Sequence, residues 1–174
     1  MYEIADKQFC YLAHPRTASV ATRDVLVGKF GAEMVGSHHT GLTVPKPTGW
    51  TVVTTVRNPL DVMISWWHKT SRNHKLSLYE FIRMWSRNTH FLPDGRLFWH
   101  SLYATHVLRY EANLEAQLNQ VLVGIGLVPV TLPAKDCTGL HGPAHYMEFY
   151  KHEARAHKLV HDHFGQETEE LGYL

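Results

Sequence analysis

Short apolar runs alternate along the chain with longer runs in which apolar positions recur at helical spacing. The short runs, rich in apolar and β-branched residues, predict strands at residues 8–13, 33–39, 50–56 and 105–111. The longer runs predict helices at residues 17–31, 57–69, 77–87, 112–126 and 143–164. No repeat or low-complexity segment interrupts this order.

Strands that alternate with helices indicate an α/β fold with a mainly parallel central sheet flanked by helices. The run WTVVTTV, residues 50–56, is apolar and β-branched on both faces, which is typical of a central parallel strand. At 174 residues the chain is long enough to bury a core of its own. We therefore expect a single domain over residues 1–174.

The helix predicted at residues 57–69 has a well-defined start. Asn58 can cap it, Pro59 suits the first helical position, and Asp61 places an acid in the first turn. The apolar positions that follow lie on one face, at Leu60, Met63, Ile64 and Trp67. The sequence thus predicts a helix that begins directly after the central strand.

Composition and charge exclude several classes of protein. Hydrophobic residues make up 44% of the chain and charged residues 19%, and a net charge of +1 argues against a general nucleic-acid binder. The first residues, MYEIADKQ, lack the pattern of a secretory signal, and the apolar run VLVGIGLVPV is too short for a membrane span. Cys10 and Cys137 do not make a disulfide framework. We expect a cytoplasmic protein with reduced thiols, no membrane span and no nucleic-acid partner.

The stretch YLAHPRTASVATRD, residues 11–24, joins the first predicted strand to a helix. At such a junction the free backbone N–H groups and the positive end of the helix dipole point to one spot, which suits an anion. Arg16 adds a permanent charge that can hold two oxygens at once. In the alternative interpretation this is an ordinary helix start with a surface arginine. The candidate N–H and hydroxyl donors are Thr17, Ala18, Ser19, Val20, Ala21 and Thr22.

A second candidate site follows the central strand. Arg57 ends that strand at the carboxyl edge, where open α/β sheets bind their ligands. Ser65 lies about two helical turns later, so both side chains can reach one anion. In the alternative interpretation Arg57 pairs with Asp61 and Ser65 faces solvent. Both candidate sites lie at the same end of the predicted sheet, which favours one ligand with two separate anionic groups.

These motifs, in this order, resemble those of the PAPS-dependent sulfotransferase family. HPRTAS follows the first strand, and RNPLDVMISWWHK is similar to that family's R-N-P-x-D-x-x-x-S stretch. VLRYEANL and the C-terminal helical segment that ends in LGY are similar as well, so the resemblance extends over most of the chain. It is closest to compact carbohydrate-type, bacterial or viral members. The resemblance implies a P-loop-like α/β fold, although the P-loop signature G-x-x-x-x-G-K-[ST] is absent.

The resemblance also implies a cofactor, 3′-phosphoadenosine 5′-phosphosulfate (PAPS), which leaves as PAP. In the family the first loop binds the 5′-phosphosulfate, here through residues 16–22, with Arg16 stabilising the charge that grows on the leaving phosphate. The arginine and serine of the second motif bind the 3′-phosphate, here Arg57 and Ser65. We expect a small-molecule or carbohydrate acceptor that offers a hydroxyl or an amine, and the sequence leaves sugar, lipid, small alcohol and peptide tyrosine open.

The acceptor must lose a proton, and histidine is the side chain best matched to neutral pH. In the family a histidine at the end of the second strand often does this, and the matching run VGSHHTG offers His38 or His39. Alternation along a strand puts these two on opposite faces, so at most one points into the cleft. The placement of the family histidine favours His38. The resemblance requires no metal, and the helical pair His157 and His161 lacks a zinc pattern around it.

The chain departs from the family pattern in three respects. Many members have lysine where this chain has Arg16, although arginine also occurs and either supplies the positive charge. Gly-Thr-Thr is common in the family where this chain has Ala18, Ser19 and Val20, so one hydroxyl is missing at Val20. The chain is also shorter than most members, which leaves the acceptor pocket undefined. Two alternatives stay open for this reason: a non-catalytic module that binds 3′-phosphonucleotides, and a nucleotide phosphotransferase, against which the missing P-loop lysine argues.

Overall fold

The structure is a computed structural model that describes residues 1–36, 48–71, 75–87, 96–133 and 143–173. The chain divides into two compact units, each described here by itself. The first unit comprises Met1–Arg57 and His100–Asp136, and the second comprises Asn58–Trp99 and Cys137–Leu174. A single sulfotransferase-like domain over residues 1–174 stays a prediction.

The first unit contains a mixed sheet with helices, which confirms the α/β class. Within the described residues its strand order is β3-β1-β2-β4-β5. β2 pairs in parallel with β4, and β4 with β5, whereas β1 pairs antiparallel with both β2 and β3. The strands are β1 (Tyr2–Ile4), β2 (Phe9–Leu12), β3 (Glu33–Met34), β4 (Thr51–Val56) and β5 (His106–Arg109).

The mainly parallel sheet predicted from the sequence is therefore correct only for β2, β4 and β5. The reason lies in the N-terminal hairpin, because β1 and β2 are joined only by the short 3-10 turn η1 (Ala5–Lys7) and Gln8. Gln8 has a left-handed φ of 49°, and its N–H donates to the Ala5 carbonyl at 3.0 Å. A parallel pair needs a crossover of about a dozen residues or more, so this short turn permits only antiparallel pairing.

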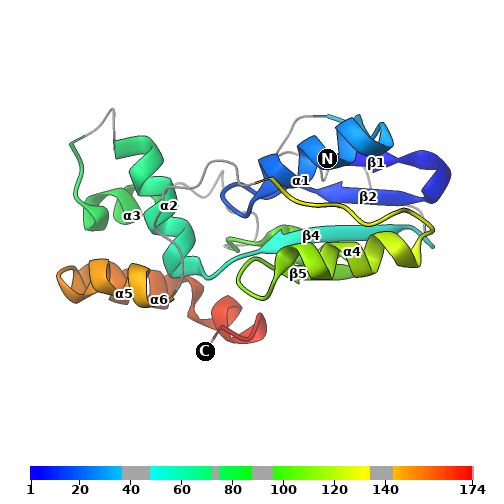
Figure 1. Cartoon of the computed structure of the whole chain (residues 1–174). Helices are drawn as coiled ribbons and strands as arrows, with labels where there is room; N and C mark the ends of the chain where they lie inside the picture. The colour runs from blue at the N-terminus through cyan, green and yellow to red at the C-terminus, as the bar shows by residue number, and fades with distance from the viewer. Residues whose placement is uncertain (37–47, 72–74, 88–95, 134–142, 174) are drawn as a thin grey trace. The chain divides into compact units, whose positions relative to one another are not determined.

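One face of the sheet is covered by the helices α1 (Ser19–Phe30) and α4 (Leu114–Gly124), which Figure 1 shows alongside the strands. Leu26 of α1 and Leu118 of α4 belong to the same buried cluster as Phe9 and Tyr11 of β2. Cys10 and Leu12, which alternate with them, belong to a separate cluster. This alternation is what the period of a strand requires when both of its faces are buried.

The carboxyl ends of β2, β4 and β5 lie at one edge of this sheet, since the three strands run in parallel. The register pairs Leu12 with Thr54, and Val56 with Arg109. The loop after β2, Arg57 after β4 and Tyr110 after β5 therefore emerge side by side. This edge carries the candidate site.

The second unit is helical within its described residues, and α2 begins where the sequence predicts. Pro59 is the first helical residue, and the Asn58 side-chain oxygen accepts a hydrogen bond from the Leu60 N–H at 3.0 Å. No described helix of the chain has the length and apolar character that crossing a membrane requires. The helices of this unit are α2 (Pro59–Ser71), α3 (Leu78–Ser86), α5 (Pro143–Lys151) and α6 (Ala154–Glu170).

The prediction of a single helix at residues 143–164 is wrong. The first helix, α5, ends at Lys151, and a second helix, α6, begins at Ala154. Glu153 leaves the helical conformation at φ −132° and ψ 52°. On either side of the break, Tyr150 and Phe164 are both buried. The Tyr150 hydroxyl donates to the Leu60 carbonyl at 3.1 Å and so ties α5 to α2.

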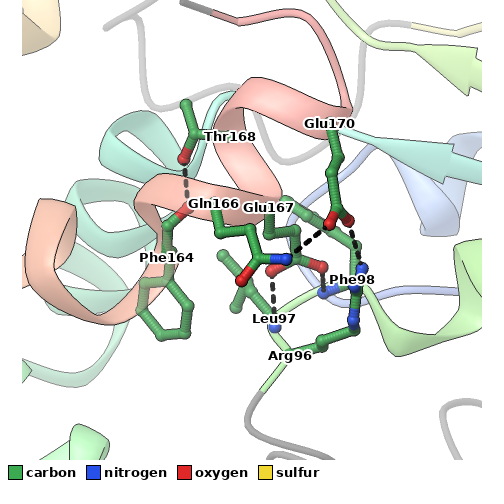
Figure 2. Close-up of polar contacts among 8 residues, drawn as sticks. All are labelled: Arg96, Leu97, Phe98, Phe164, Gln166, Glu167, Thr168 and Glu170. Atoms are coloured by element: carbon green, nitrogen blue, oxygen red, sulfur yellow. Dashed lines mark hydrogen bonds and ion pairs between the residues drawn. The ribbon is translucent and has the colours of Figure 1, made fainter.

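A buried carboxylate on α6 holds the segment before the 3-10 turn η4 (Trp99–Tyr103). The two oxygens of Glu167 accept hydrogen bonds from the backbone N–H groups of Leu97 and Phe98, each at 2.8 Å (Figure 2). Glu170, one turn later, pairs with Arg96 at 2.7 Å on the surface. Burial raises the pKa of Glu167, and the two backbone N–H groups oppose that rise. In the second unit, the buried Glu167 side chain thus accepts hydrogen bonds from two backbone N–H groups.

Candidate functional site

The loop between β2 and α1 contains two residues in left-handed conformations. Arg16 has φ 65° and Ala18, the N-cap of α1, has φ 61°. L-residues with a Cβ adopt this region at a cost of roughly 1–2 kcal/mol each. Such strain persists only where the surrounding structure imposes it, and it concentrates at functional sites. The loop that the sequence singled out is therefore a strained loop.

The positive end of α1 lacks the side-chain cap and first-turn acid that neutralise the starts of α2, α3 and α4; α6 also lacks both. Ala18 provides no side-chain cap, and the first turn of α1 contains no acid. By contrast, the Asn58, Ser77 and Asn113 side chains each accept a bond from the start of a helix, and all three helices have an acid in their first turn. Uncapped N–H groups and an unopposed helix dipole attract an anion.

The Thr17 hydroxyl serves the structure of the loop itself. Thr17 is fully buried, and its hydroxyl donates to the His14 carbonyl at 2.9 Å. Ser19 and Thr22 are buried as well. A ligand role for these hydroxyls stays a prediction, and the backbone N–H groups of α1 are the donors that the geometry favours.

A buried phenol lies beneath the loop. The Tyr11 hydroxyl is 3.3 Å from the Thr55 hydroxyl and entirely buried. Burial raises the pKa of Tyr11, while the hydroxyls of Thr55, Thr22 and Thr17 act in the opposite direction. Tyr11, near the end of β2, is therefore a neutral and hydrogen-bonded side chain.

This raised pKa predicts a loss of stability at alkaline pH. The unfolded chain ionises its tyrosines near pH 10 and the folded chain keeps Tyr11 neutral, so its contribution is complete below pH 10 and disappears above it. We expect wild type to exceed Tyr11→Phe in free energy of unfolding by about 1 kcal/mol at pH 8, through the lost hydrogen bond. That margin should shrink above pH 10 by up to about 1.4 kcal/mol per pH unit. Urea unfolding of both proteins from pH 8 to pH 11.5 measures it, and a constant margin would contradict the pKa direction.

Arg57 reaches from the end of β4 to the strained loop. Its guanidinium donates to the Arg16 carbonyl at 3.1 Å and lies over the Tyr110 ring, 4.4 Å from the ring centroid. Only 4% of Arg57 is exposed. This guanidinium lies beside the uncapped start of α1. The positively charged side chains of the site therefore follow two strands: Arg16 follows β2, and Arg57 follows β4.

The structure brings most of the predicted residues together in the first unit. The loop residues and Arg57 lie at the same sheet edge, as the parallel strands require. Ser65 belongs to the second unit, where it is buried within α2. His38 and His39, the candidate bases, lie outside the described residues, and so does Cys137.

Three residues at this edge escaped the sequence analysis. Tyr110 lies in the run VLRYEANL, to which no site role was assigned, although a residue directly after a parallel strand emerges at the edge where such sheets bind ligands. His14 and His100 are buried and meet edge to face, with ring centroids 5.5 Å apart. The Pro15 carbonyl, 2.9 Å from His14 Nδ1, can only accept, which places a proton on that nitrogen. Nothing in the sequence pairs His14 with His100, because they are distant along the chain.

The strain at Ala18 makes a testable prediction. Ala18→Gly should raise the free energy of unfolding by about 0.5–1 kcal/mol, because glycine adopts a φ of 61° without the Cβ penalty. The matched control is Ala21→Gly, in the helical part of α1, which should instead lower it by about 1 kcal/mol. Chemical denaturation of both variants gives the comparison. Equal losses in the two would show that position 18 carries no left-handed strain.

No protein-family model matches the chain, and no curated protein or solved structure matches it. Within the described ranges, no group of histidine, cysteine, aspartate and glutamate side chains is arranged to hold a metal ion. The functional interpretation therefore rests on the residues of this chain.

Proposed function

We propose that this protein is a PAPS-dependent sulfotransferase with a P-loop-like fold, which moves the sulfuryl group of PAPS to a hydroxyl or amine acceptor. The observation that carries the proposal is the position of Arg57, whose guanidinium bonds to the Arg16 carbonyl beside the uncapped start of α1. A ligand with two separate anionic groups suits a site whose cations come from two strand ends.

Each anionic group of the cofactor has its own set of residues in this proposal. Arg16 and the N–H groups at the start of α1 hold the 5′-phosphosulfate, with Thr17, Ser19 and Thr22 around them. Arg57 holds the 3′-phosphate. Ser65 is the second residue that the sequence motif assigns to this phosphate. The loop suits this role because Ala18 brings no side-chain oxygen that competes with a bound anion.

The chemistry places distinct demands on these residues. PAPS supplies an activated sulfuryl group, whose bond to the 5′-phosphate oxygen breaks as the acceptor oxygen or nitrogen bonds to sulfur. Negative charge grows on that phosphate, and Arg16 and the α1 N–H groups are the donors that stabilise it. His38 or His39 accepts the acceptor proton. No metal is needed where cationic and N–H groups neutralise the leaving phosphate.

A transfer assay tests the catalytic part of the proposal. The purified protein is incubated with radiolabelled PAPS and a panel of carbohydrates, small alcohols and amines, and label on the acceptor is measured. The expected result is transfer to at least one acceptor class, lost in the double variant His38→Ala, His39→Ala, which should still bind PAP. PAP binding without transfer in wild type would instead indicate a binding module that lacks catalysis.

A further inference from the structure

Tyr110 is the aromatic residue that follows β5 at the sheet edge of the candidate site. Its backbone N–H donates to the Val56 carbonyl at 2.9 Å, which anchors it to the residue directly before Arg57. Its side chain is half-buried and packs against the main core cluster of the first unit. The ring is therefore held from two sides, by a backbone bond and by packing.

The ring face of Tyr110 supports the Arg57 guanidinium. The separation of 4.4 Å between the guanidinium carbon and the ring centroid is well within the range of a cation–π contact. An arginine side chain has many rotamers, and a buried guanidinium needs compensation for the water it loses. The aromatic face supplies attraction and restricts the plane of the guanidinium, while the Arg16 carbonyl holds one nitrogen.

We propose that Tyr110 is a positioning residue, which fixes Arg57 in the orientation that binds the 3′-phosphate of the cofactor. The inference rests on the proposed function and assigns a role that neither motif of the sequence contains. Tyr110 acts through Arg57, so its contribution disappears when Arg57 is removed. A flat ring is what matters, because the guanidinium lies over the ring and the phenol oxygen is not part of that contact.

Calorimetric titration of PAP and ADP into two variants tests the role. Tyr110→Leu removes the ring, and we expect PAP affinity to fall about five- to thirtyfold while ADP affinity changes less than about twofold. Tyr110→Phe keeps the ring and should retain the wild-type preference for PAP. Tyr110→Met is a second variant without a ring, for use if Tyr110→Leu does not fold.

A purely structural role for Tyr110 gives a different pattern. It would lower stability and weaken PAP and ADP alike, whereas positioning changes the ratio of the two affinities. Adding Tyr110→Leu to Arg57→Ala should then leave PAP affinity unchanged within about twofold. A Tyr110→Leu variant that keeps the wild-type preference for PAP overturns this inference alone. Equal binding of PAP and ADP by wild type overturns the proposed function, and this inference with it.

Discussion

Arg57→Ala should remove the preference of the protein for PAP over ADP. The two ligands share adenosine and its 5′-phosphate. PAP adds a 3′-phosphate, which is the group assigned to Arg57, whereas ADP adds its second phosphate at the 5′ end. Losing one partner of a largely buried charge pair costs about 2–4 kcal/mol, so the Kd for PAP should rise roughly 30- to 1,000-fold. The Kd for ADP should change much less, because its phosphates bind the loop and the start of α1.

Two control variants separate a specific contact from a general loss of charge. Arg109, at the end of β5, has an exposed position near the same edge, and Arg109→Ala should leave the preference intact. Arg57→Lys keeps the charge without the planar fork and should retain only part of the preference. If Arg109→Ala weakens PAP as strongly as Arg57→Ala does, the site is a diffuse positive surface and the assignment of Arg57 is wrong.

Glu167→Ala should destabilise the second unit more than other single changes to its polar contacts. The alanine leaves the backbone N–H groups of Leu97 and Phe98 buried without an acceptor, and each costs about 1–3 kcal/mol. We expect a total loss of about 2–6 kcal/mol in the free energy of unfolding. The control Glu170→Ala removes two exposed contacts, the pair with Arg96 and the hydrogen bond from the Gln166 amide, and should cost less than about 1 kcal/mol.

The pH dependence gives Glu167 a second test. Its pKa is higher in the folded chain than the ordinary value of 4.5, so its contribution to stability is complete below about pH 4.5 and declines as pH rises through the folded pKa. The margin of wild type over Glu167→Gln should therefore be larger at pH 4 than at pH 7. Urea unfolding at both values measures this margin. A margin that grows toward pH 7 would show that the two N–H groups outweigh burial.

The parts of the fold that sequence predicted well are those with strong local signals. β4 follows from an uninterrupted β-branched run, and the start of α2 follows from Asn58 and Pro59. β1 has only three residues and no such signal, and its antiparallel pairing depends on the turn that follows it. The break after Lys151 has neither proline nor glycine to mark it, so the helical pattern runs through it.

In the candidate site, too, the features with local sequence signals were predicted and those that depend on tertiary contacts were not. The loop at Arg16 and the position of Arg57 follow from where strands end, which local sequence reveals. The bond from Arg57 to the Arg16 carbonyl and the ring of Tyr110 beneath the guanidinium depend on neighbouring strands, which only the sheet order brings together. The burial of the Thr17 hydroxyl is equally a tertiary property, since a threonine in a loop can face either way.

Calorimetric titration of the wild-type protein with PAP, and separately with ADP, tests the central claim most directly. The account predicts that PAP binds with a Kd at least about tenfold lower than that of ADP, because only PAP offers a 3′-phosphate to Arg57, whereas both phosphates of ADP are at the 5′ end. Absence of PAP binding, or equal binding of the two ligands, would contradict the assignment of a 3′-phosphate site and with it the sulfotransferase proposal.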